Sequence, residues 1–196
     1  MMQGIVGGFA KGMKLQVPKG ESTRPTSSKV RQAVLSAVYH WIPAGNILDL
    51  FAGSGAMGLE FLSRGAESCT FVEVNGHALQ CIRANLEAMK RRADQADHHI
   101  ATNVIGRAVE DSAGDIKKAA PFDVIWADAP YRLISGSVSE WARTWRDWLA
   151  ADGLVVVECA VADIEAVNRA FSGMGWSCYR ERTYGQTAIS MWRMET

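Results

Sequence analysis

Short apolar runs alternate with helix-periodic segments along most of the chain. The apolar runs predict strands at residues 46–51, 68–74, 102–105, 122–127 and 154–159. Apolar positions at three- and four-residue spacing predict helices at 56–64, 77–90, 138–149 and 163–174, with a weaker helix before residue 122. This alternation is typical of an α/β fold, in which helices join the strands of a parallel sheet by right-handed crossovers.

Both ends of the chain depart from this alternation. Residues 30–41 carry apolar side chains on one face of an amphipathic helix, which the segment Pro43-Ala44-Gly45 ends. Near the other end, residues 176–184 and 187–194 flank Gly185-Gln186, a pattern that predicts two strands joined by a tight turn. We therefore expect a mostly parallel sheet that closes with an antiparallel edge strand.

Composition limits the class of protein. The chain has 196 residues, of which 48% are hydrophobic and 21% charged, as expected for one globular domain. No apolar run approaches the roughly 18 residues that span a bilayer, and the opening segment does not resemble a signal peptide, so we expect a cytoplasmic protein without a membrane partner. The four cysteines lack C-x-x-C spacing, so neither disulfides nor a metal site are expected. Helical spacing predicts that Trp141, Trp145 and Trp148 pack against the sheet.

Charge is unevenly distributed although the net charge is zero. The first 31 residues contain six basic residues and one acidic residue, so they carry +5 and the remainder carries −5. This asymmetry suggests a basic N-terminal arm, residues 1–25, ahead of a catalytic domain at 26–196. Such an arm is suited to RNA phosphates, and a solvated tail explains the charge equally well. The candidate RNA-binding residues are Lys11, Lys14, Arg24 and Arg31.

A glycine-rich loop follows the first predicted strand. Residues 53–58 match G-x-G-x-x-G, and Glu73 ends the next strand, where a carboxylate can accept hydrogen bonds from ribose hydroxyls. The spacing alone fits a nicotinamide dinucleotide, S-adenosylmethionine or a simple tight turn. Asp49 beside the loop would repel a pyrophosphate and would attract the ammonium and sulfonium charges of S-adenosylmethionine. Methyl transfer is therefore favoured over hydride transfer.

A second loop, Asp128-Ala129-Pro130-Tyr131, follows the strand predicted at 122–127. An exocyclic base amine is a poor nucleophile, so an enzyme must orient its nitrogen toward the methyl group. The Asp128 carboxylate and the Ala129 carbonyl can each accept one N–H, while Pro130 fixes the turn and Tyr131 can stack on the base. A purely structural turn is the other interpretation of this tetrapeptide.

The two loops resemble those of amino-methyltransferases with an [Asn/Asp]-Pro-Pro-[Tyr/Phe] motif. Flanking residues narrow the resemblance to the bacterial 16S rRNA guanine-N2 methyltransferases of the RsmD type. These flanking segments are Gly7-Gly8, Lys11-Gly12, Arg24-Pro25-Thr26, Val30-Arg31, the run 49–56, Gly58-Leu59-Glu60, Ser63-Arg64-Gly65-Ala66, Asn85-Leu86 and Tyr184-Gly185-Gln186-Thr187.

This resemblance implies a Rossmann-like class I methyltransferase fold with a seven-stranded sheet and a short N-terminal extension. It implies methyl transfer from S-adenosylmethionine to the N2 amine of guanine 966, in 16S rRNA or a small-subunit assembly intermediate, with release of S-adenosylhomocysteine. The cofactor-binding positions are then Asp49, Phe51, Ala52, Gly53, Ser54, Gly55, Glu73, Val74, Arg107 and Ala108.

Three positions depart from the pattern of this family. Ala129 stands where proline is usual, Arg107 where an acidic residue is expected to meet the adenine amino group, and Met13 where a basic residue is common. Other interpretations stay open: an amino-methyltransferase acting on DNA adenine or a protein amide, a nicotinamide-dependent oxidoreductase, and a non-catalytic RNA-binding protein.

Overall fold

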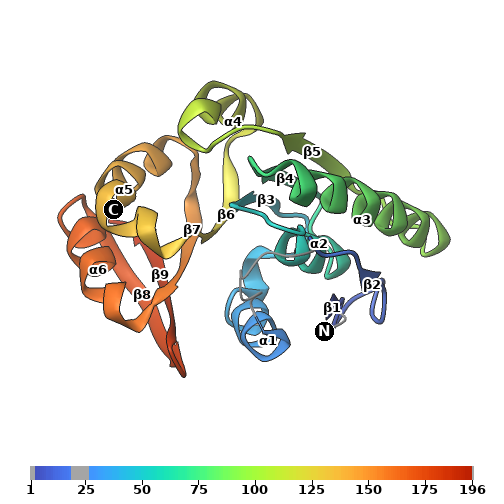
Figure 1. Ribbon diagram of the computed structural model, residues 1–196, viewed down its shortest axis with the longest axis horizontal. Coiled ribbons are helices and arrows are strands. Elements are labelled where there is room, and N and C mark those ends of the chain that lie inside the picture. The colour runs from blue at the N-terminus through green and yellow to red at the C-terminus, as the bar shows by residue number, and fades with distance from the viewer. Residues whose placement is uncertain (1–2, 19–26, 196) are drawn as a thin grey trace.

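The fold is built on a seven-stranded sheet. In the computed structural model, residues 3–18 and 27–195 are described. The sheet order is β5-β4-β3-β6-β7-β9-β8; neighbours pair in parallel from β5 to β7, whereas β9 is antiparallel to both β7 and β8 (Figure 1). The strands are β3 (Asn46–Leu50), β4 (Ser68–Val72), β5 (Ala101–Ile105), β6 (Phe122–Asp128), β7 (Leu149–Ala160), β8 (Trp176–Tyr184) and β9 (Thr187–Met194). The predicted parallel sheet with an antiparallel edge is confirmed.

Helices cover both faces of the sheet. They are α1 (Ser28–Ala37), α2 (Ala56–Ser63), α3 (Gly76–Gln95), α4 (Ala113–Ala119), α5 (Tyr131–Thr144) and α6 (Ile164–Ser172). Because side chains alternate along a strand, Val124 and Trp126 pack with α1, α2 and α3, whereas Ile125 and Ala127 pack with α4, α5 and α6. Both faces of the central strands are therefore buried, which explains their continuous apolar runs.

The N-terminal segment is attached to the domain. Its short strands β1 (Gln3–Gly4) and β2 (Lys14–Leu15) pair antiparallel. Ile5, Ala10 and Met13 are buried in the same apolar cluster as α1 and α2. These three side chains thus contribute to the domain core, so the described part of the basic arm expected for 1–25 packs on the domain. The expected boundary at residues 25 and 26 falls outside the described residues.

The helix predicted at 138–149 begins and ends earlier than expected. Helix α5 starts at Tyr131 directly after Pro130, whose φ of −52° suits the residue that precedes a helix. It ends at Thr144, and Leu149 instead begins β7, where it is in register with Phe122. The prediction for the three tryptophans is confirmed, since Trp141, Trp145 and Trp148 are buried on the side of the sheet that α4, α5 and α6 cover.

The sheet topology indicates where a ligand binds. The chain runs outward from β3 through β4 to β5, then returns to pair β6 with the other side of β3. In parallel α/β sheets, ligands bind beyond the carboxyl ends of the strands at the point where the order reverses. The two loops singled out in the sequence follow β3 and β6, so both lie at this point.

Candidate active site

Loop 1, residues 51–55, has a constrained backbone. Phe51, Gly53 and Gly55 all have positive φ, of 57°, 55° and 77°. A bulky residue such as Phe51 adopts this conformation rarely, and such backbone strain is found most often at functional sites. A Cβ added at Gly55 would lie 3.3 Å from Phe71, so a larger residue would press on the core. The cap residue Gly55 makes no side-chain hydrogen bond to the first turn of α2, and within that turn the Gly58 N–H donates to the Asp49 carboxylate.

Three side chains from distant parts of the chain hold loop 1. The N–H of Gly53 donates to Glu73 Oε2 at 2.7 Å, and the Ser54 carbonyl accepts from Asn85 Nδ2 at 2.9 Å. The Ser54 hydroxyl donates to Gln3 Oε1 at 3.2 Å. The loop is therefore positioned by β4, α3 and the N-terminal segment together. Sequence reasoning found Glu73 but assigned no role to Asn85 or Gln3.

Asn85 joins loop 1 to the N-terminal segment. Its side chain is 2% exposed. Its Oδ1 accepts from the Gln16 N–H at 2.8 Å, and its Nδ2 donates to the Gln16 carbonyl at 2.9 Å as well as to Ser54. A backbone segment next to the exposed Lys14 is thus fixed to the glycine loop through one amide.

Four carboxylates lie on one face of the sheet at the carboxyl ends of adjacent strands. Asp49 lies in β3, Glu73 follows β4, Asp128 ends β6 and Glu158 lies near the end of β7. Each acid lies two positions after a residue that packs with α1, α2 and α3. Because side chains two positions apart in a strand point to the same face, all four acids lie on the side covered by these helices. The four acids create a negative potential at this edge, which is suited to a cationic ligand.

Asp49 is the most deeply enclosed of these acids. It is 1% exposed, and its Oδ2 accepts the Gly58 N–H of α2 at 2.8 Å. Burial raises the pKa of Asp49 well above its usual value, and the charges of Asp128 and Glu73 raise it further. The sequence placed Asp49 beside the loop, and in the structure its carboxylate faces α2.

Glu73 connects loop 1 to the end of β4. Besides accepting from Gly53, its carboxylate accepts the N–H groups of Val74 at 2.8 Å and Asn75 at 2.7 Å. These bonds fix the carboxylate beside the glycine loop while leaving lone pairs for further donors. Val74, expected near the cofactor, is 66% exposed.

The second loop brings Asp128 and Tyr131 together with two residues that the sequence did not indicate. Tyr131 is 50% exposed, and its hydroxyl is hydrogen-bonded to the Thr187 side chain. Burial raises the pKa of Tyr131, and the nearby Asp128 and Glu158 carboxylates raise it further. Asp128 is in register with Glu158 on the neighbouring strand, and Ala129 is buried. The sequence could have indicated Glu158, because Glu158, like Asp128, is an acidic residue near the carboxyl end of a strand in the parallel part of the sheet.

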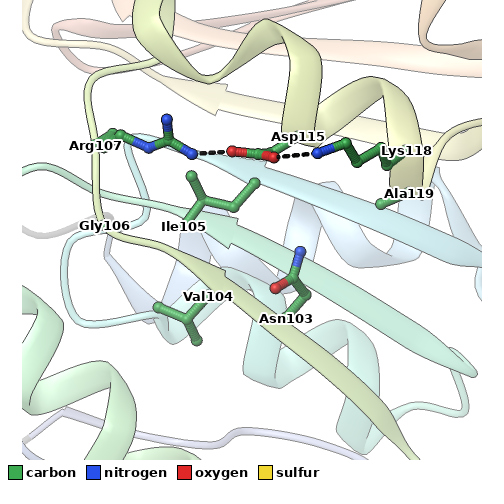
Figure 2. Close-up of a pocket in the computed structure, with 8 residues that line it drawn as sticks. All are labelled: Asn103, Val104, Ile105, Gly106, Arg107, Asp115, Lys118 and Ala119. Atoms are coloured by element: carbon green, nitrogen blue, oxygen red, sulfur yellow. Dashed lines mark hydrogen bonds and ion pairs between the residues drawn. The ribbon is translucent and has the colours of Figure 1, made fainter.

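Arg107 is engaged with α4. Its guanidinium forms an ion pair with Asp115, and Asp115 also accepts from Lys118 Nζ at 2.9 Å. Figure 2 shows this row beside an open pocket of about 440 Å³, lined on one side by β5 and on the other by α4. The carbonyl of the neighbouring Ala108 accepts from the Ser112 hydroxyl at 2.6 Å. The charge of Arg107 is thus offset by a partner from α4.

The four predicted RNA-binding residues differ in their environments. Lys11 and Lys14 are exposed, whereas Arg24 lies outside the described residues. Arg31 is 1% exposed; its Nη2 donates to the Gly4 carbonyl at 2.8 Å, and its Nε lies 3.6 Å from the buried Glu60 carboxylate. The prediction for Arg31 is therefore wrong, because this arginine binds the N-terminal segment and α2 inside the protein.

Residues 3–193 match the family described as Conserved hypothetical protein 95, the RsmD family. The chain belongs to this family. It is similar to the Ribosomal RNA small subunit methyltransferase D of Escherichia coli K12, with 31% identity over 97% of this chain and 89% of that protein. The protein of the same name from Haemophilus influenzae is 27% identical over 96% of this chain and 92% of its own length.

Solved structures support the same assignment. The Escherichia coli protein yhhF is 28% identical, covers 100% of this chain and 99% of its own, and gives a TM-score of 0.76. A methyltransferase structure complexed with SAH is 12% identical, covers 84% of this chain and 48% of its own, and gives a TM-score of 0.63, which shows the fold alone. Members of the RsmD family thus share with this chain the Rossmann-like class I methyltransferase fold.

Within 3–18 and 27–195, no group of three or more His, Cys, Asp or Glu side chains could hold a metal ion. Over the same ranges, no helix is both long enough and apolar enough to cross a membrane.

Proposed function

We propose that the chain transfers a methyl group from S-adenosylmethionine to the N2 amine of a guanine in 16S rRNA, with guanine 966 as the expected target. One observation carries this proposal: the Asp128–Tyr131 loop, with its amine-orienting acceptors, lies at the same sheet edge as the glycine loop and its carboxylates. The names of the Escherichia coli and Haemophilus influenzae relatives support rRNA of the small subunit as the substrate.

The residues at loop 1 fit the proposed cofactor. S-adenosylmethionine supplies a methyl group on a positively charged sulfur, next to an ammonium group. An ionised Asp49 attracts both cations, Gly53 and Gly55 let the backbone approach the methionine end, and the Glu73 carboxylate can accept hydrogen bonds from the ribose hydroxyls. Phe51, Ala52 and Ser54 complete the loop, and Val74, Arg107 and Ala108 are proposed for the adenine end. A carboxylate cluster of this kind disfavours the pyrophosphate of a nicotinamide cofactor.

The second loop orients the target amine. The Asp128 carboxylate and the Ala129 carbonyl each accept one N–H, so that the remaining orbital of the nitrogen points at the methyl group. The half-exposed ring of Tyr131 provides a surface on which the base can stack, and its hydrogen bond to Thr187 fixes the ring. Asp128 acts as an orienting acceptor, and the proton leaves after the methyl group has been transferred. Ala129 retains the required carbonyl although the family's usual proline is absent.

The RNA is proposed to approach across the N-terminal segment. Lys11 and Lys14 are exposed there, and Arg24 belongs to the same stretch of sequence. A guanine must leave any helix to reach Asp128, which costs a few kcal/mol and costs less when the base is already unpaired. The substrate is therefore proposed to be an unpaired region of 16S rRNA, free or in a small-subunit assembly intermediate, in the cytoplasm.

Labelled S-adenosylmethionine tests this proposal directly. We expect methyl incorporation into guanine N2 of unmodified 16S rRNA or of the small subunit, and incorporation into neither would refute it. Asp128→Ala should abolish turnover and leave S-adenosylhomocysteine binding unchanged, whereas Asp111→Ala, at an exposed acid between β5 and α4, should leave both unchanged. Equal loss of turnover and cofactor binding would show that Asp128 is structural.

A further inference from the structure

The edge strand β8 presents an unusually exposed surface. Residues 177–183 of this strand are all exposed. Glu181 faces α6, where its Oε2 accepts from Asn168 Nδ2 at 3.0 Å. Arg180 and Arg182 flank Glu181 and point to the opposite face, which Arg193 of β9 shares. One face of the β8–β9 hairpin therefore carries three exposed arginines.

This face is continuous with the second loop. The strand registers pair Asp128 with Glu158, Glu158 with Ile189, and Ile189 with Arg182. Residues paired in this way lie on one face of a sheet, and adjacent strands are about 4.8 Å apart, so the Cα atoms of Asp128 and Arg182 are about 14 Å apart. Strand β9 of the hairpin also begins at Thr187, the hydrogen-bond partner of the Tyr131 side chain.

Aromatic rings hold one of the arginines in place. The guanidinium of Arg193 lies 4.8 Å from the ring centroid of Trp41 and 4.8 Å from that of Tyr179. Arg180 lies 5.6 Å from the same Tyr179 ring. Stacking orders a guanidinium at little further entropic cost and leaves its N–H edge available to a phosphate.

The arginines also lack acidic partners. Among the described residues, no ion pair joins Arg180, Arg182 or Arg193 to a carboxylate. Within residues 3–18 and 27–195, these guanidinium groups make one hydrogen bond, from Arg182 Nη1 to the Glu181 carbonyl at 2.9 Å. Positive charge beside the exposed ring of Tyr179 and the half-buried ring of Trp41 is complementary to a nucleic-acid strand.

We propose that this surface, the arginine platform (Trp41, Tyr179, Arg180, Arg182 and Arg193), binds the RNA backbone next to the nucleotide held by Asp128. The inference rests on the proposed function, since it concerns the substrate of the same site. An RNA strand whose target base enters the second loop continues along β8, where the arginines contact its phosphates and Tyr179 contacts a neighbouring base.

The test compares two double variants that each remove two exposed arginines. Arg180→Ala with Arg182→Ala removes two of the platform's three arginines, and Arg83→Ala with Arg91→Ala removes the same charge from α3. Binding of a 16S rRNA fragment is measured over a salt series. Two lost phosphate contacts should lower the slope of log affinity against log salt by about 1.5 and weaken binding by about 30-fold at 0.1 M salt.

The α3 control should keep the affinity and slope of the unaltered protein, and both variants should bind S-adenosylhomocysteine normally. Equal RNA affinity in the platform variant and the control would overturn the proposal. So would a changed oligomeric state in light scattering with unchanged RNA binding, because the surface would then join two copies of the chain. Methyl incorporation by the unaltered protein is scored separately, so failure of the proposed function is distinguishable from failure of the platform.

A conservative variant separates stacking from charge. Arg193→Lys retains the positive charge but loses the planar group between Trp41 and Tyr179. We expect weaker RNA binding with an almost unchanged salt slope, and full retention of affinity would show that stacking contributes nothing.

Discussion

Replacing Asn85 by alanine tests whether the N-terminal segment positions the cofactor loop. The substitution removes three hydrogen bonds, two to the backbone of Gln16 and one to the Ser54 carbonyl. A neutral hydrogen bond contributes about 1 kcal/mol to stability, so the free energy of unfolding should fall by about 3 kcal/mol. Losing the Ser54 anchor alone should weaken S-adenosylhomocysteine binding by about fivefold, the equivalent of about 1 kcal/mol.

Asn46 provides a matched control at the other end of the sheet. Its amide also makes three hydrogen bonds through its side chain, to the carbonyls of Ala119 and Pro121 and from the Ser68 hydroxyl. Asn46→Ala should therefore cost similar stability in urea unfolding but leave cofactor affinity in calorimetry unchanged. The reasoning would be refuted if Asn85→Ala lost stability while binding S-adenosylhomocysteine as tightly as the Asn46 variant.

The remaining predictions concern the buried residues Asp49, Glu60 and Gly58. Since the pKa of Asp49 is raised by burial and then by neighbouring acids, S-adenosylmethionine affinity should fall as pH falls through that raised pKa, and Asp49→Asn should remove the dependence in a calorimetric pH series. Because its pKa is raised, the Asp49 carboxyl binds a proton more tightly in the folded protein than in the unfolded chain. The free energy of unfolding should therefore decline as pH rises toward the raised pKa, and Asp49→Asn should abolish this decline. Glu60→Gln leaves the charge of Arg31 buried without its carboxylate partner, so the free energy of unfolding in urea should fall by about 3 kcal/mol. A fall of under about 1 kcal/mol would show that this ion pair is not structural. Gly58→Ala places a Cβ 2.3 Å from the Phe71 ring and should destabilise by about 1–3 kcal/mol, whereas Gly114→Ala, with nothing within 4 Å, should be neutral or stabilising in thermal unfolding.

The sequence predicted the fold well where periodicity was strong. The strands at 176–184 and 187–194 match β8 and β9 because polar and apolar positions, with a Gly-containing turn between them, specify a hairpin locally. Helix α5 was misplaced because its first turns lack a regular apolar period, while the apolar Leu149 appeared to continue the helix. Pairing of Leu149 with Phe122 decided that position, and such a contact between distant segments leaves no local pattern.

The candidate site shows the same division. Residue type and spacing were enough to indicate the glycine loop, Glu73 and the Asp128–Tyr131 loop. Charge and sequence position could not distinguish Arg31, which is buried against Glu60, from the exposed Lys11 and Lys14. Burial depends on which segments pack together, so it was decided only by the fold.

The sequence by itself determined the order of strands and helices, the two loops and the family, because each of these is encoded in local pattern or in residue type. Tertiary structure decided which groups act together. Asn85 lies 31 positions after Ser54 and 69 after Gln16, yet it binds both. Likewise, Asp128, Glu158 and Arg182 form one row only because β6, β7, β9 and β8 are neighbours in the sheet. Sheet order and register arise from the burial of whole faces, a property of the folded chain that no single segment contains.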